Sequence, residues 1–336
     1  MEPAQILLAV MWVGLTLYAL LGGADFGAGV LDLLAGRSRA GMPQRRLIEH
    51  SIGPVWEANH VWLIFVLVVL WTGFPLVFAS VMSTLYIPLT LAALGIIARG
   101  AAFAFRKAST ELWQQRLFGG AFALSSVLTP FFLGTVAGAI ASARVKPGLA
   151  AGDLVRSWLN PTSLLGGALA VLVCAYLAAV YLCDDAARSG TPELADGFRR
   201  RALVAAAATG AVALAGIAVL HQDAPRLYSG LTHRALPLVV ASAVLGIASI
   251  VLLWRRRYLL VRVAGVLAVV AVMWGWPVAQ YPAVLPPGLT YRDAAAAPVV
   301  ISTVLVVAGV GALLVLPSIL WLFLLQRRMP YDSHQT

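Results

Sequence analysis

Charged side chains are scarce in this chain of 336 residues. Asp, Glu, Lys and Arg together make up 11% of it, against about 25% in soluble domains. Acidic residues are the scarcest, with 14 Asp and Glu against 24 Lys and Arg and a formal net charge of +10, while 61% of the residues are hydrophobic. So little charge excludes an ordinary soluble domain and indicates an all-α, polytopic membrane protein.

Cysteine and the common catalytic motifs are also nearly absent. Cys174 and Cys183 lie along one apolar segment and form neither a CxxC pair nor a CxxCH haem-attachment motif, so we expect both to be small buried residues. No P-loop, HExxH, GxSxG or zinc-type spacing occurs. The first residues carry no cationic region, so we expect a retained first helix rather than a cleaved signal peptide.

Apolar runs of spanning length fill most of the chain. We predict nine transmembrane helices, roughly at 5–34, 53–72, 75–98, 117–142, 162–183, 202–221, 235–254, 259–279 and 298–325. The polar links between them are too short to fold separately. We therefore expect one polytopic membrane domain over 1–336.

The basic residues predict the orientation of these helices. Of the 24 Lys and Arg residues, 18 fall after the first, third, fifth and seventh segments or in the C-terminal tail, and six fall in the other links. Because cytoplasmic links carry the excess of Lys and Arg, the N-terminus is predicted outside and the C-terminus in the cytoplasm. An odd number of helices, such as nine, agrees with this.

Polar residues open the second apolar segment. The sequence Ser51-Ile-Gly-Pro54 is typical of a helix start, with a serine cap and a proline in the first turn. Glu57, Asn59, His60 and Trp62 follow within two turns, and Glu57 shares a helix face with His60. An ionisable residue inside a membrane suggests a functional site by default.

Acidic residues of the first two segments are expected at similar depth. Asp25 lies toward the cytoplasmic half of the first segment, and Glu57 lies one to two turns in from the same side. Asp32 shares the face of Asp25, and the glycines within 22–29 would let a neighbouring helix approach closely. Arg99, at the inner end of the third segment, is a natural charge partner for one of these acids.

Two interpretations of Asp25 and Glu57 remain open. One is a structural ion pair or hydrogen-bonded set that fixes helix packing, and the other is a proton or cation path open to the cytoplasm. Haem ligation is disfavoured, because a di-haem bundle needs facing histidine pairs. His60 is the one histidine predicted in the membrane, and the others lie outside it: His50, His221, His233 and His334.

Two stretches resemble subunit II of the cytochrome bd-type quinol oxidases. They are GGADFGAGVL at 22–31 and SIGPVWEANHVWLI at 51–64, whose Trp-acid-x-Asn-x-Val-Trp pattern is specific. The similarity covers the whole chain and includes Arg99 and Arg106 after the third helix. WGWPVAQYP at 274–282, with the prolines and threonine that follow it, is similar to the shorter, cyanide-insensitive branch.

The resemblance implies a fold and a partner. The fold would be two four-helix bundles plus one peripheral helix, with the first bundle at about 5–142 and the second bundle and last helix at about 162–325. The chain would bind no haem and would form a heterodimer with a homologous subunit I, which carries haem b, haem d (or a further haem b) and the quinol site. Some members add a small single-helix accessory subunit or a structural quinone.

The resemblance also implies a role in respiration. The complex would be an electrogenic quinol:oxygen oxidoreductase of a bacterial or archaeal cytoplasmic membrane. This subunit would stabilise subunit I and contribute to a cytoplasmic proton path for the reduction of oxygen to water. Asp25, Glu57 and Trp62 carry over to that path, with Asn59 and His60 beside them. The chain departs from some members at Gly22, where they have a second aspartate, and at Glu57, where they have the shorter acid.

Two other interpretations of the chain's function remain open. A secondary transporter would also have polytopic helices and intramembrane carboxylates, although its polar residues would be expected in both halves of the chain. Here they cluster in the first three helices and near one face. The second alternative is a purely structural assembly subunit, which differs from the oxidase subunit with a proton path only in whether Asp25 and Glu57 carry protons.

Overall fold

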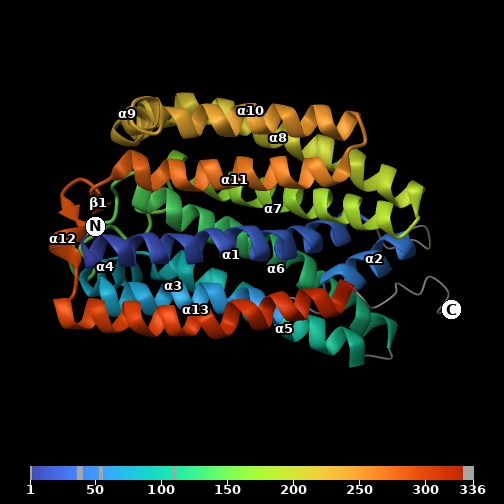
Figure 1. Ribbon diagram of the computed structural model, residues 1–336, viewed down its shortest axis with the longest axis horizontal. Helices are drawn as coiled ribbons and strands as arrows, with labels where there is room; N and C mark the ends of the chain where they lie inside the picture. The colour runs from blue at the N-terminus through green and yellow to red at the C-terminus, as the bar shows by residue number, and fades with distance from the viewer. Residues whose placement is uncertain (1, 36–40, 53–55, 109–110, 328–336) are drawn as a thin grey trace.

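The computed structural model describes residues 2–35, 41–52, 56–108 and 111–327, which are mostly helical (Figure 1). The elements in chain order are α1 (Pro3–Leu34), α2 (Met42–Ile52), α3 (Trp56–Gly73), α4 (Pro75–Thr84), α5 (Tyr86–Ala108), α6 (Leu112–Ala141), α7 (Pro161–Arg188), α8 (Pro192–Asp223), α9 (Pro225–Thr232), α10 (Leu236–Trp254), α11 (Tyr258–Gln280), β1 (Ala283–Leu285), β2 (Leu289–Thr290), α12 (Tyr291–Ala294) and α13 (Pro298–Arg327).

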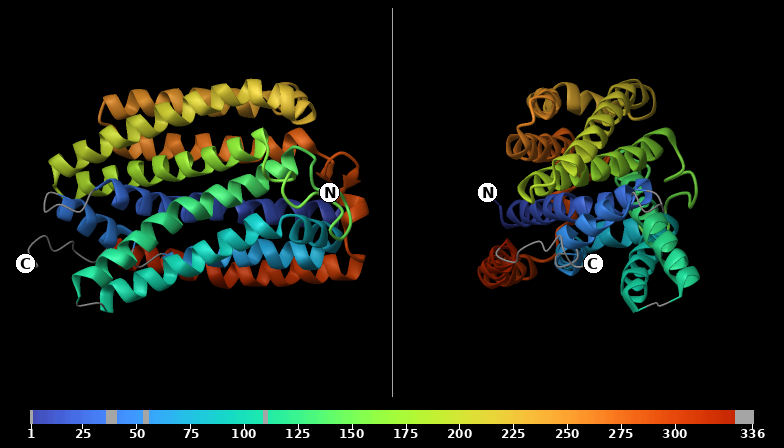
Figure 2. Two further views of the ribbon diagram at one scale, coloured as in Figure 1. Left: turned by 180° about the vertical axis from the view of Figure 1, so that it is seen from behind. Right: turned by 90° about the vertical axis from the view of Figure 1, so that its right-hand side faces the viewer.

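Helices α1 and α7 lie side by side in the middle of an elongated bundle (Figures 1 and 2). On one side α7 packs against α8 and α11, and α10 packs on α11; on the other side α1 packs against α3, with α13 beyond. The close approach of α1 to α7 depends on Gly27, because a Cβ there would collide with the backbone carbonyl of Cys174. Small residues at such contacts are what helix packing in lipid requires.

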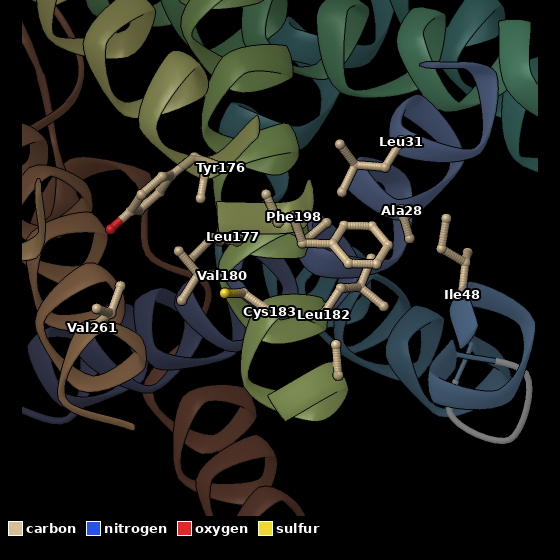
Figure 3. Close-up of a cluster of buried hydrophobic side chains, with 14 of the residues drawn as sticks. Ala28, Leu31, Ile48, Tyr176, Leu177, Val180, Leu182, Cys183, Phe198 and Val261 are labelled. Carbon is tan, nitrogen blue, oxygen red and sulfur yellow. The ribbon is translucent and has the colours of Figure 1, made fainter. Parts of the chain in front are cut away.

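Two clusters of buried apolar side chains hold the bundle together. The first joins α1, α2, α7, α8 and α11 and includes Leu31, Leu177 and Phe198 (Figure 3). The second joins α1, α3, α4 and α13 with the β1–β2 hairpin. Cys174 and Cys183 are both buried and unbridged, which confirms the expectation that they are small core residues.

The number of membrane crossings depends on how one bend is counted. In the described part of the chain, eight helices are long and apolar enough to span a bilayer, and the number is nine if α3 and α4 form one bent span. These two helices turn through 118° at Phe74, between Gly73 and Pro75. The nine spanning helices therefore remain a prediction.

The helix predicted over 75–98 is wrong in its bounds. The structure divides that stretch into α4, which ends at Thr84, and α5, which begins at Tyr86 and continues to Ala108. Pro88 explains the break, because it has no N–H to bond to the carbonyl of Thr84 four residues earlier. The third candidate span is therefore α5, which begins about ten residues later than expected.

The helix start predicted at Ser51 is also wrong. Ser51 and Ile52 are the last residues of α2, and the Gly53 and Pro54 of the proposed start lie outside the described residues. The α2 helix forms because Leu47 and Ile48 are buried in the first cluster, while Arg45 Nε reaches to 3.8 Å from Asp32 Oδ1 of α1. Tertiary packing of one apolar face thus stabilises a short helix within a polar link.

The two ends of the bundle differ in what they carry. One end, called here the hairpin end, holds α9, α12 and the β1–β2 hairpin, in which Ala283 pairs with Thr290 (Figure 1). The opposite end, called the basic end, holds α2, the start of α8 and the turn between α10 and α11. At the hairpin end, Arg144 Nη2 lies 2.7 Å from Asp223 Oδ1, which ties the end of α6 to the end of α8.

Candidate functional site

Among the described side chains, the most deeply buried charged groups form an ion pair between α1 and α5. Arg99 Nη2 lies 2.8 Å from Asp25 Oδ1 and donates a second hydrogen bond, also of 2.8 Å, to the backbone carbonyl of Asp25. Both residues are only 2% exposed. Breaking such a buried pair by removing one partner typically destabilises a protein by about 3–5 kcal/mol, because the other charge is left uncompensated.

Helix α6 completes the surroundings of the arginine. Arg99 Nη1 donates to the hydroxyl oxygen of Ser126, and the Ser126 hydroxyl in turn donates to the Phe122 carbonyl at 2.5 Å. The guanidinium lies 4.2 Å from the centre of the Phe122 ring and 5.2 Å from that of Phe26. These contacts fix the guanidinium plane, so the carboxylate of Asp25 meets a preorganised donor.

Gly29 is what allows the three helices to meet at this point. A Cβ at Gly29 would collide with the Ser126 side chain and with Arg99 Nη1. Glycine at 29 therefore permits α1 to approach α5 and α6 closely, which is the role predicted for the glycines around Asp25. Without that approach, Arg99 could not bond to both Asp25 and Ser126.

Helix α3 brings further polar side chains to the same region. The His60 ring is centred 6.3 Å from that of Tyr18 and 6.1 Å from that of Phe26. Trp62 packs against the small cluster formed by Tyr18, Phe26 and Cys174. Asn59 is 3% exposed.

Several buried polar atoms of this region have unused hydrogen-bonding capacity. Among the described residues, no hydrogen-bond partner lies within reach of Asp25 Oδ2, the Tyr18 hydroxyl, Asn59 Oδ1 or Trp62 Nε1. Buried polar groups are nearly always paired in proteins, and in a bilayer an unpaired group costs several kcal/mol. The site can therefore take up further hydrogen-bonding groups, of which water is the smallest.

The structure brings together most of the residues singled out from the sequence. Of the acids considered for Arg99, it places Asp25 against the guanidinium, while Asp32 lies near Arg45. The side chain of Glu57 lies outside the described residues, although its backbone belongs to α3. Whether Glu57 shares the site with Asp25 thus stays a prediction.

Sequence reasoning missed two polar residues of the site, Tyr18 and Ser126, as well as the rings of Phe26 and Phe122. Tyr18 stands seven residues before Asp25, two turns earlier on the same face of α1, so its spacing was a usable signal. Ser126 lies in the middle of an apolar segment, where a hydroxyl is unremarkable because it can bond to its own helix. Its role depends on the approach of Arg99 from another helix.

No group of three or more His, Cys, Asp or Glu side chains in the described ranges is arranged to hold a metal ion. The side chains of the site that can exchange protons are instead the carboxylate of Asp25, the imidazole of His60 and the phenol of Tyr18, which lie in the same region. Carboxylates and imidazoles are the usual groups for taking up and releasing protons in proteins. The arrangement is chemically suited to moving or holding a proton inside the membrane.

Comparison with known proteins gives consistent matches. The family model described as cytochrome bd terminal oxidase subunit II matches residues 3–326. The curated cytochrome bd ubiquinol oxidase subunit 2 of Bacillus subtilis (strain 168) is 31% identical over 170 residues, which cover 50% of this chain and 48% of that protein. The cytochrome bd-I ubiquinol oxidase subunit 2 of Escherichia coli (strain K12) is 28% identical over 40% of this chain and 34% of its own length.

The alignments thus span about half, or less, of the curated relatives. A similarity in fold extends further. A chain of the bd oxidase from Geobacillus thermodenitrificans superposes with a TM-score of 0.77 at 24% identity, covering 97% of this chain and 98% of that chain. This match supports the fold over nearly the full length.

Proposed function

Because this chain belongs to the cytochrome bd terminal oxidase subunit II family, we propose that it is the second membrane subunit of a quinol:oxygen oxidoreductase. It stabilises a homologous subunit I that carries haem b and haem d, or a further haem b, and oxidises quinol. This chain itself binds no haem. The complex resides in a bacterial cytoplasmic membrane and generates charge separation by taking up protons from the cytoplasm.

The specific contribution of this chain is a segment of the proton path. Asp25, Glu57, Asn59, His60 and Trp62 line it, and Arg99 is the buried charge partner of Asp25. The observation that supports it is the half-satisfied carboxylate of Asp25, whose Oδ1 accepts from Arg99 while Oδ2 has no partner among the described residues. An acceptor of this kind beside Tyr18 and His60 can bind water and exchange a proton with it.

The alternative hypothesis, that the chain is a secondary transporter, has no comparable support. The family match favours a terminal oxidase subunit, and the buried ion pair and its unpaired neighbours lie on α1, α3, α5 and α6, within the first half of the chain. A transporter built from inverted repeats would be expected to place corresponding polar sites in both halves.

A double substitution separates the proton path from a purely structural ion pair. Asp25→Asn alone leaves Arg99 buried without a counter-charge, so we expect impaired assembly of the complex. Asp25→Asn combined with Arg99→Gln removes both charges and retains hydrogen-bonding side chains. We expect this double variant to assemble with a normal haem spectrum but to consume oxygen at least about tenfold more slowly, equivalent to roughly 1.4 kcal/mol on the limiting barrier.

The hypothesis that the ion pair is purely structural makes the opposite prediction for this double variant. If Asp25 serves packing alone, the neutral pair should restore oxygen consumption together with assembly. Arg45→Gln is a matched control, because it removes an arginine near Asp32 at the rim of the same bundle without touching the buried pair. Wild-type turnover in the double variant would rule out Asp25 as a proton carrier.

A further inference from the structure

Two arginine triplets that are far apart in the sequence meet at the basic end. Residues 199–201 lie in the second and third turns of α8, and residues 255–257 form the turn between α10 and α11. Asp196 joins them, because its carboxylate lies 3.2 Å from Arg199 Nε and 3.2 Å from Arg256 Nη2. One acid thus holds two groups of cations next to each other.

The charge of this cluster is far from balanced. Arg200, Arg255 and Arg257 are exposed, and no described carboxylate forms an ion pair with any of them. Arg256 is also mostly exposed, at 60% of its side chain, and shares Asp196 with Arg199. The cluster therefore presents several guanidinium groups to an anion from outside.

Helices α8 and α10 continue from this cluster with an outward apolar surface. They lie on one outer side of the bundle (Figures 1 and 2) and are among its less buried spans. Val204 of α8 is 70% exposed, and Ile247 and Trp254 of α10 are 64% and 72% exposed. Trp254 immediately precedes Arg255, which is the order expected where hydrocarbon gives way to headgroups.

We propose that this surface is a binding site for an anionic phospholipid. Its phosphate would be held by Arg200, Arg255 and Arg257, since guanidinium groups bind phosphate through paired, charge-assisted hydrogen bonds. Its acyl chains would lie along the exposed side chains of α8 and α10. Such a site is independent of the reaction that the assembly performs.

General rules for cations at helix ends do not account for this cluster. A helix C-terminus favours a cation in its last turn, and basic residues favour the cytoplasmic side, but neither rule requires two triplets to converge. Arg256 has φ of 55° at the position after the helix cap, where its N–H bonds to the Leu253 carbonyl and that of Arg257 bonds to Leu252. Glycine is the usual residue at this position, so an arginine there runs against the backbone preference.

Native mass spectrometry of the full chain, purified with its co-extracted subunits, tests the proposal. The delipidated protein is titrated with phosphatidylglycerol and with phosphatidylcholine of the same acyl chains. We expect preferential binding of phosphatidylglycerol, and we expect Arg200→Gln, Arg255→Gln and Arg257→Gln together to weaken it at least about tenfold. These side chains are exposed and lack carboxylate partners in the described part, so the variant should still fold.

A charge-matched variant provides the control. Lys146→Gln, Arg156→Gln and Arg226→Gln remove three exposed cations near the hairpin end, and we expect phosphatidylglycerol binding to be unchanged. Equal losses in both variants, or equal binding of the two lipids by the wild type, would overturn the proposal. Displacement of the lipid by a matched concentration of inorganic phosphate would also overturn it, since it would mean that the acyl chains contribute nothing.

A second measurement covers the case in which the triple variant does not fold. Arg200→Lys, Arg255→Lys and Arg257→Lys keep the charge but lose paired hydrogen bonding. We expect intermediate affinity for phosphatidylglycerol, and for the wild type an affinity that falls as salt is added. Affinity that is independent of salt would contradict a site based on arginine and phosphate.

Discussion

At Asp25, one carboxylate oxygen is committed and the other is not. Oδ1 accepts from Arg99, and Oδ2 has no hydrogen-bond partner among the described residues. A residue kept for packing alone would gain from satisfying both oxygens, because an unmade hydrogen bond costs about 1–3 kcal/mol in a buried site. The asymmetry at this residue is therefore the strongest local argument for exchange with water.

Glu57 provides the second test of the path at the scale of single residues. It is the second residue of α3, and in the sequence it stands between Trp56 and the apolar run that begins at Val61. Glu57→Gln keeps the size of the side chain but cannot ionise. We expect the complex to retain its haem spectrum and to lose at least about tenfold in quinol-driven oxygen consumption.

Glu57→Asp is the matched variant for this test. It keeps an acid of the length found in some members of the family, so it should preserve partial activity. Oxygen consumption and proton uptake are measured on the same preparations. A Glu57→Gln complex that turns over at the wild-type rate, with proton uptake still coupled, would remove Glu57 from the path.

Gly27 gives a prediction about stability rather than activity. Gly27→Ala would force a methyl group into the backbone carbonyl of Cys174, so α1 and α7 must separate. Overpacking of this kind costs about 1–3 kcal/mol, and we expect a lower thermal unfolding midpoint of the purified complex. Gly210→Ala is the control, because nothing beyond its chain neighbours and the backbone of its own helix lies within 4 Å of a Cβ there, and its midpoint should stay the same or rise slightly. Equal shifts in both would contradict the packing argument.

At the scale of helices, hydrophobic runs predicted the spans better than their ends. The apolar segments at 5–34, 162–183 and 259–279 match α1, α7 and α11 closely, because length and hydropathy mark the segments that can span a bilayer. The break between α4 and α5 was missed because both sides of it are apolar. Pro88 was the available signal, since a proline inside an apolar run has no N–H to continue the helical hydrogen bonds and so marks a place where the helix can break.

The short helix α2 shows a different limit of sequence reasoning. Its 11 residues are polar on average and read as a link, with a helix start at Ser51. The helix depends on Leu47 and Ile48 reaching a cluster built by α1, α7 and α8. Contacts of this kind cannot be inferred from local spacing, because they require the position of three other helices.

The candidate site was predictable in part for the same reason. Asp25 and Arg99 were identified because charged residues are rare inside the apolar segments of a membrane protein. Ser126 and the rings of Phe26 and Phe122 were not, because such residues are ordinary in an apolar helix. Their part in the site arises from the geometry of Arg99, whose side chain reaches two neighbouring helices.

At the scale of the whole molecule, the two ends of the bundle follow the charge asymmetry of the sequence. The start of α8 and the α10–α11 turn, which hold the two arginine triplets, lie at the end opposite α9 and the β1–β2 hairpin (Figure 1). If cations mark the cytoplasmic side, the basic end faces the cytoplasm and the hairpin end faces outward. The proton path and the lipid site would then open to, or lie near, the same side.

This orientation is testable with reporter fusions. We expect a reporter fused after Thr336 to be active only in the cytoplasm, and one inserted in the 221–234 link, which contains α9, to be active only outside. An insertion within 189–191, between α7 and α8, is the internal control and should report the cytoplasm. The physical reason is that moving arginine-rich links across a bilayer is disfavoured relative to retaining them. The opposite pattern would contradict the predicted topology and would place Asp25 in the outer half of the membrane, where uptake of cytoplasmic protons through it could not begin.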